Sequence, residues 1–178
     1  MQALYAFELS GGAQEAAIAN VLEGLSETEN DLEFAKKLFF KVLETRAELD
    51  KLIHDKLAQW ELHRVAVIDR MLLRIGVCEL LYFDDIPPKV TINEAIEIAK
   101  LFSTDASGKF VNGVLDAVHQ ELKKSGKLIK RGIGLIQSSK IRDEKINVPE
   151  NHKKKITPLL SLYFDDFQTQ ANRKLVDV

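Results

Sequence analysis

The chain has 178 residues, of which 46% are hydrophobic and 29% are charged, and these values fit a globular domain with a substantial core. A formal net charge of −2 says little about partners, because the charge is distributed unevenly along the chain. The single cysteine, Cys78, excludes an internal disulfide and favours a reducing compartment. The N-terminal residues lack the basic and apolar regions of a signal peptide, so we expect a cytoplasmic protein.

The first third of the chain predicts four amphipathic helices, at residues 1–9, 13–25, 31–46 and, more weakly, 48–57. Their apolar residues recur at spacings of three and four, which places them on one face of an α-helix. Ser10, Gly11 and Gly12 end the first helix, since glycine readily adopts the backbone geometry that follows a helix. Residues 26–29 offer an N-cap and an acidic first turn for the third helix.

Residues 64–83 (RVAVIDRMLLRIGVCELLYF) predict the central helix of the domain, because apolar residues occupy nearly all of its faces. A membrane-spanning helix is the competing interpretation. Asp69, Arg70, Arg74 and Glu79 argue against it, since a charge at the centre of a bilayer costs about 2.5–3.5 kcal/mol. We therefore expect a buried helix in a soluble protein without a membrane span.

Two further helices follow the proline pair Pro87-Pro88, which interrupts the helical pattern. Thr91 and Glu94 match a capping box, so the first of these helices is expected to begin at Thr91. The segment 103–105 (STD) then starts a last helix, which carries an apolar stripe up to Leu122. No strand-like alternation occurs before residue 125. The sequence thus predicts an all-α domain of about seven helices over residues 1–124.

The remaining residues, 125–178, predict a basic C-terminal extension that is partly flexible, because glycines and Pro149 break the helical period. Residues 123–155 contain 11 Lys or Arg and three Asp or Glu, a local charge of +8. An apolar cluster at 159–167 could pack on the domain or on a neighbouring chain, so both a monomer and a homodimer remain open.

The residue types do not favour an enzyme. The four histidines (His54, His63, His119 and His152) show no metal-ligand spacing with each other or with Cys78. The glycines at 132 and 134 lack the third glycine and the strand–turn–helix context of a phosphate-binding loop. We expect no catalytic residues, no metal and no cofactor, and we expect Cys78 to be a core residue.

A binding function fits residues 89–116 better. Phe102 and Phe110 lie on either side of a helix junction with lysines nearby, and aromatic rings beside lysines suit stacking of unpaired bases with phosphates held by charge. Gly113 follows Asn112 within an apolar run, where glycine costs about 1 kcal/mol against alanine, so another backbone is expected to approach it. Core packing of the phenylalanines and tight helix packing at Asn112 are the alternatives.

The same region closely resembles the NusB family of bacterial transcription antitermination factors, through residues 89–100 (KVTINEAIEIAK), Phe102 and residues 109–116 (KFVNGVLD). Residues 2–5 (QALY) resemble the family's first helix, and residues 73–75 (LRI) with 79–80 (EL) resemble its central helix. The resemblance implies two small helical bundles packed across each other. It also implies binding of the single-stranded boxA RNA of ribosomal RNA leaders together with NusE, a small-subunit ribosomal protein, within the RNA polymerase antitermination complex.

The resemblance carries functional roles onto the matching positions. The residues expected to contact RNA are Gln2, Tyr5, Arg74, Lys89, Phe102, Lys109, Phe110 and Asn112. The residues expected to contact the protein partner are Asp69, Asp105 and Phe110. The family's arginines ahead of the first helix are not present in the given sequence, whose first basic residue is Lys36; either an upstream stretch precedes Met1, or the RNA is held elsewhere. We hypothesise that the extension after Lys123 partly replaces them, the alternative being a solvated or partner-docking tail.

Two other functions are compatible with these motifs. A NusB-like domain could be the accessory domain of a ribosomal RNA cytosine methyltransferase, but the residues after Lys123 are too few for the α/β cofactor-binding domain that such an enzyme needs. Alternatively, the chain could be an interaction module that contacts proteins without binding RNA.

Overall fold

The computed structural model describes residues 1–22, 28–57 and 61–131, and these residues form seven α-helices, one 3₁₀ turn and no strand. This confirms the predicted all-α fold. The helices are α1 (Gln2–Ser10), α2 (Gln14–Leu22), α3 (Glu29–Glu44), α4 (Arg46–His54), α5 (Val67–Tyr82), α6 (Pro88–Phe102) and α7 (Asp105–Lys124), with the 3₁₀ turn η1 at Leu62–Arg64 between α4 and α5.

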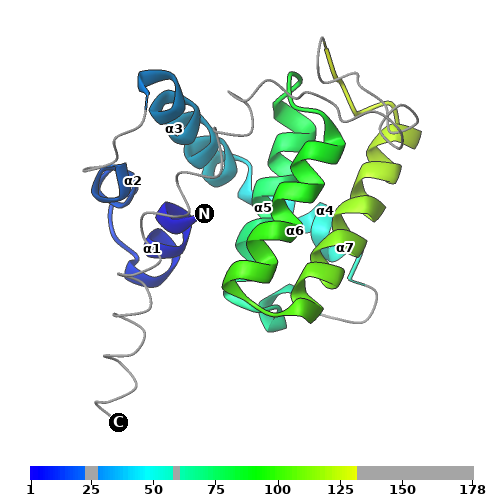
Figure 1. Ribbon diagram of the computed structural model, residues 1–178, viewed down its shortest axis with the longest axis horizontal. Helices are drawn as coiled ribbons and strands as arrows, with labels where there is room; N and C mark the ends of the chain where they lie inside the picture. The colour runs from blue at the N-terminus through cyan, green and yellow to red at the C-terminus, as the bar shows by residue number, and fades with distance from the viewer. Residues whose placement is uncertain (23–27, 58–60, 132–178) are drawn as a thin grey trace.

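The helices form two groups (Figure 1). Helices α1, α2 and α3 pack together on one side, and α4, α5, α6 and α7 form a second group in which α6 and α7 run side by side. The groups meet where α1 and α3 contact α5. This arrangement agrees with the two small bundles that the sequence predicted.

Helix α5 is the centre of the molecule, as its all-round apolar pattern predicted. Leu73, Val77, Cys78 and Leu80 are each fully buried. Burial raises the pKa of the Cys78 thiol to about 12, so the thiol stays protonated and behaves as a core residue. No helix among the described residues is long and apolar enough to cross a membrane.

Local sequence signals explain most helix boundaries. Gly11 has a left-handed backbone conformation (φ 60°) and donates its N–H to the Phe7 carbonyl, which ends α1. Thr28 caps α3, accepting the N–H of Asp31 on its hydroxyl. The predicted start of α6 is wrong, because α6 begins at Pro88 rather than at Thr91. Proline is well suited to the first turn of a helix, so Thr91 lies inside α6 and is buried.

A short strap, defined here as residues Lys127–Arg131, follows α7 and returns to the end of α5. Lys130 Nζ donates to the main-chain carbonyls of Glu79 and Phe83, at 3.0 and 2.8 Å. Arg131 donates its main-chain N–H to the Asp84 carbonyl at 2.8 Å, and its guanidinium lies 3.3 Å from the Asp84 carboxylate. The strap therefore joins the C-terminal ends of α5 and α7. The apolar cluster at 159–167 and most of the predicted extension lie outside the described residues.

Candidate nucleic-acid interface

The junction between α6 and α7 is a short, hydrogen-bonded corner. Phe102 is the last residue of α6, and Thr104 caps α7 by accepting the Ser107 N–H at 3.1 Å. The Ser107 hydroxyl also lies 2.8 Å from the Ser103 hydroxyl and 3.0 Å from that of Thr104. These bonds hold the first turn of α7 against the end of α6, so the residues on both sides of the corner keep a fixed spacing.

Exposed cationic and polar side chains gather at this corner beside partly buried phenylalanines. Phe102 and Phe110 pack against the core but remain partly exposed. The sequence left two alternatives, stacking at the surface and packing in the core, and each residue combines features of both. Leu101 is 62% exposed, an unusual position for a leucine, and the sequence analysis missed it. We call this group the junction patch; its members are Lys100, Leu101, Phe102, Lys109, Phe110 and Asn112, of which Lys100, Lys109 and Asn112 are exposed.

The helical period of α6 predicts that Leu101 faces outward. Ile98 and Ala99 face the core, and Leu101 lies two or three residues beyond them, next to the exposed Lys100. An apolar side chain on the outward face of a helix is a candidate contact for a partner rather than a core residue.

Gly113 occupies open space on α7. No atom lies within 4 Å of the position that a Cβ would take there. The alternative of tight helix packing at Asn112 and Gly113 is therefore wrong within the described residues, and the approach of another backbone to Gly113 from outside the chain stays a prediction. The close approaches occur at Gly76, where a Cβ would lie 2.8 Å from Leu115, and at Gly108, where it would lie 3.3 Å from Lys100.

Arg74 is not available to RNA, contrary to the sequence-based expectation. Its side chain is only 5% exposed, and its guanidinium donates two hydrogen bonds to Asp50, at 2.7 and 2.9 Å. A third nitrogen lies 3.4 Å from Glu8, which also pairs with Arg46 and Arg70. A buried arginine in a bidentate pair stays with its carboxylate, so Arg74 links α1, α4 and α5.

The residues expected to contact the protein partner have different environments. Asp69 in α5 is only 6% exposed, and its contact with a partner stays a prediction. Asp105 is the first residue of α7, and its side chain lies outside the described part of the structure. Phe110 keeps part of its ring accessible in the junction patch.

The other expected RNA contacts lie away from the junction patch. Lys89, in the first turn of α6, and Phe102 are thirteen residues apart on one helix, which corresponds to about 20 Å. Gln2 and Tyr5 are partly exposed residues of α1, in the other helical group. The sequence therefore named residues at both ends of α6 and on α1, and the structure gathers only those of the α6–α7 corner into one patch.

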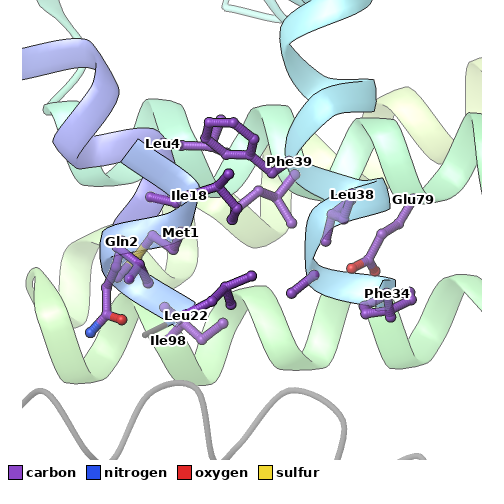
Figure 2. Close-up of a pocket in the computed structure, with 14 residues that line it drawn as sticks. Met1, Gln2, Leu4, Ile18, Leu22, Phe34, Leu38, Phe39, Glu79 and Ile98 are labelled. Atoms are coloured by element: carbon purple, nitrogen blue, oxygen red, sulfur yellow. The ribbon is translucent and has the colours of Figure 1, made fainter. Parts of the chain in front are cut away.

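Gln2 borders an apolar cavity of about 100 Å³ between the two helical groups. Figure 2 shows the Gln2 amide at one edge of the cavity and the Glu79 carboxylate at another. Glu79 is 3% exposed, and burial raises the pKa of its carboxyl to about 7, while the nearby Thr91 hydroxyl and Lys130 ammonium act in the opposite direction. The other lining residues are apolar apart from Gln2.

No cluster of three metal-ligating side chains occurs among the described residues. The histidines do not gather: His54 and His63 are exposed on α4 and η1, and His119 is partly buried on α7. Burial lowers the pKa of His119. The arrangement at the junction patch is suited to binding a partner by stacking and charge.

Several known proteins are similar to this chain in sequence and fold. The NusB family model matches residues 1–120. The transcription antitermination protein NusB of Salinibacter ruber is 46% identical over 144 residues, which are 80% of this chain and 90% of that protein. The solved structure of T. maritima NusB is 39% identical with a TM-score of 0.64, over 67% of this chain and 84% of that one.

A second solved structure contains antitermination factors NusB and NusE in complex with dsRNA. It is 28% identical to this chain, with a TM-score of 0.63, over 67% of this chain and 89% of that one. The family model spans most of the sequence, and the curated relatives share both the fold and a high identity. The chain therefore belongs to the NusB family, whose members are transcription antitermination factors and not enzymes.

Proposed function

We propose that this protein is a transcription antitermination factor that binds the boxA RNA of ribosomal RNA leaders together with NusE, as part of the RNA polymerase antitermination complex. The observation that carries the proposal is the junction patch, where exposed Lys109 and Asn112 lie beside the accessible edges of Phe102 and Phe110. These four residues belong to the segments that resemble the family most closely.

The chemistry of the junction patch favours unpaired bases. An aromatic ring stacks on any base that is free of its partner, and such stacking contributes about 1–3 kcal/mol per base. Lys100 and Lys109 supply positive charge for the phosphates, and the Asn112 amide can both donate to and accept from a base edge. Lys100 also pairs with Glu97 at 2.6 Å, so Lys109 is the more available cation.

The protein partner would occupy the same corner of the molecule. Leu101 is an exposed apolar side chain next to the patch, and NusE would bury it together with the edge of Phe110. A solved relative combines NusB and NusE with dsRNA, so we infer that one surface of this chain binds RNA and protein side by side. The methyltransferase alternative is not favoured, because the relatives are transcription factors.

The proposal is tested by titrating labelled boxA RNA with the full chain, alone and with NusE, at several salt concentrations. We expect binding that NusE strengthens, and we expect single-stranded RNA to bind better than the same sequence in a duplex. Lys109→Gln should reduce the slope of log affinity against log salt by about 0.7, the value for one phosphate contact on a single strand. Lys51→Gln, an exposed lysine on α4, is the matched control and should leave the slope unchanged.

Three outcomes distinguish the candidate functions. Binding of NusE without any binding of RNA would identify a protein-only interaction module. Preference for the duplex would contradict stacking on the junction patch. Equal effects of Lys109→Gln and Lys51→Gln would place the RNA elsewhere on the molecule.

A further inference from the structure

The strap and the end of α7 form a second, strongly basic surface at the end of α6 opposite to the junction patch. Antiparallel packing brings the last residues of α7 beside the first residues of α6, and the strap crosses to the C-terminal end of α5 (Figure 1). We call this surface the basic end; its members are Lys89, Lys123, Lys124, Lys127, Lys130 and Arg131.

The charge of the basic end contrasts with the rest of the fold. The carboxylates nearest to these six cations are Asp84 and Asp85 of the adjoining turn, Glu79 of α5 and Glu121 of α7, so positive charge is in excess. Residues 1–122 carry 12 Lys or Arg and 21 Asp or Glu, a net charge of −9. A positive surface on an otherwise acidic domain attracts a polyanion to one place.

Part of this charge has an internal role. Lys130 is held by the carbonyls at the end of α5, and Arg131 pairs with Asp84. Burial lowers the pKa of Lys130 to about 8. Lys123, Lys124 and Lys127 are exposed, and they form no salt bridge within the described residues. The helix dipole favours cations at the end of α7, but this effect fades beyond the last turn and does not account for Lys127.

We propose that the basic end binds the phosphates of RNA that flanks the boxA element, with Lys123, Lys124 and Lys127 as the main contacts. The proposal rests on the proposed function, since it extends the path of the same RNA. Lys89 lies about 20 Å along α6 from the junction patch. RNA that continues beyond boxA from the junction patch along α6 would arrive at the basic end.

The strap fixes the geometry of this surface. Lys130 and Arg131 tie it to the end of α5 and the turn that follows, and the main chain of Lys127 is held by the Leu122 carbonyl at the end of α7. Apart from Lys89, the members of the basic end lie beyond the part of the chain that the family model matches, 1–120.

The test compares the wild type with a triple variant, Lys123→Gln, Lys124→Gln and Lys127→Gln, in the full chain with NusE. A matched triple control, Lys36→Gln, Lys51→Gln and Arg64→Gln, removes the same charge from exposed positions on α3, α4 and η1. Each protein is titrated with two RNAs over a range of salt. One RNA contains boxA alone, and the other contains boxA with unstructured flanks on both sides.

For the flanked RNA, we expect the slope of log affinity against log salt to be smaller in the triple variant by about 2, since each lost phosphate contact on a single strand contributes about 0.7. Its slope on the short RNA and the slopes of the control should stay at wild-type values. An unchanged slope on the flanked RNA, an equal loss on both RNAs, or an equal loss in the control would overturn the inference.

The same titrations separate this inference from the proposed function. If the wild type fails to bind the short boxA RNA but binds the flanked RNA through the three lysines, the boxA assignment is wrong and the basic end stands as an RNA-binding surface. If the wild type binds neither RNA, both proposals are wrong.

Discussion

Gly76 and Gly113 have opposite environments: the first lies in a tight helix contact and the second on an open surface. Gly76 in α5 lies against the fully buried Leu115 of α7, so hydrogen is the only side chain that fits there without movement. Gly113 in α7 has open space around it, and nothing within the described fold accounts for a glycine in the middle of an exposed helix face.

We therefore predict opposite effects of the same substitution. Gly113→Ala should raise the free energy of unfolding by about 1 kcal/mol, because alanine favours the helix and meets no neighbour. Gly76→Ala should lower it, because Leu115 must move. Urea denaturation measures both. A Gly113→Ala protein that is more stable but binds boxA RNA and NusE less well would identify Gly113 as a contact residue; unchanged binding would remove it from the interface.

Glu79 gives a prediction for the pH dependence of stability. Its carboxyl has a pKa of about 7 in the fold, against an ordinary value of 4.5. Because the folded state holds the proton more tightly than the unfolded state, this group makes the fold less stable as pH rises from about 4.5 to about 7. In Glu79→Gln that dependence is absent. Between pH 5 and pH 8, the free energy of unfolding of the variant should therefore rise by about 2–3 kcal/mol relative to that of the wild type.

The measurement is the unfolding free energy of both proteins at several pH values. The difference between them isolates Glu79 from the other titrating groups, including His119, whose pKa burial lowers. A difference that does not change with pH would contradict a protonated Glu79 in the fold.

At the scale of helices, the buried ion pairs connect the two helical groups. Glu8 of α1 accepts from Arg70 and Arg74 of α5, and Arg74 also holds Asp50 of α4. The pairs fix the angle at which α1 meets α5, and α1 carries Tyr5, one of the expected RNA contacts. Arg74 thus affects the interface through the position of α1.

We predict that Arg74→Met lowers the free energy of unfolding by about 3 kcal/mol, since it removes the bidentate partner of Asp50 and one of the three arginines that pair with Glu8. Arg74→Lys should recover only part of the loss, because an ammonium cannot form the bidentate contact with Asp50. Thermal and urea unfolding give the values. A stable Arg74→Met protein with a specific loss of RNA binding would restore Arg74 as a direct contact.

The sequence predicted the helices well because the spacing of hydrophobic residues indicates which face of a helix is buried. The central helix, the helices up to His54 and the corner before α7 follow from that period. Where two local signals competed, as at the start of α6, the fixed geometry of Pro88 prevailed over the capping box at Thr91.

Pairing across long stretches of sequence was not predictable in this way. Arg74 and Asp50 are 24 residues apart, and Arg74 and Glu8 are 66 apart. A period shows that Arg74 lies on a buried helix, but it does not identify the carboxylates that neutralise it. The same limit applies to the strap, whose contacts with α5 join residues about 50 positions apart.

At the scale of the whole molecule, charge is separated along the chain. The helical domain up to Leu122 carries a net charge of −9, and residues 123–155 carry +8. The first five positive charges of that basic stretch, at residues 123–131, lie in α7 and the strap rather than in the extension. A deletion that tests the extension alone must therefore begin at residue 132.

Deletion of residues 132–178 should leave the fold intact, because residues 1–131 include all seven described helices and the strap that joins α5 to α7. The deletion removes six Lys or Arg and three Asp or Glu between residues 132 and 155. If the extension contacts the RNA backbone, the slope of log affinity against log salt for flanked boxA RNA should fall by at least about 0.7, one phosphate contact on a single strand. Circular dichroism and thermal unfolding check the fold, and RNA titration over a range of salt checks the slope. A shortened chain that folds and binds with the wild-type affinity and slope would show that the extension has no role in RNA binding.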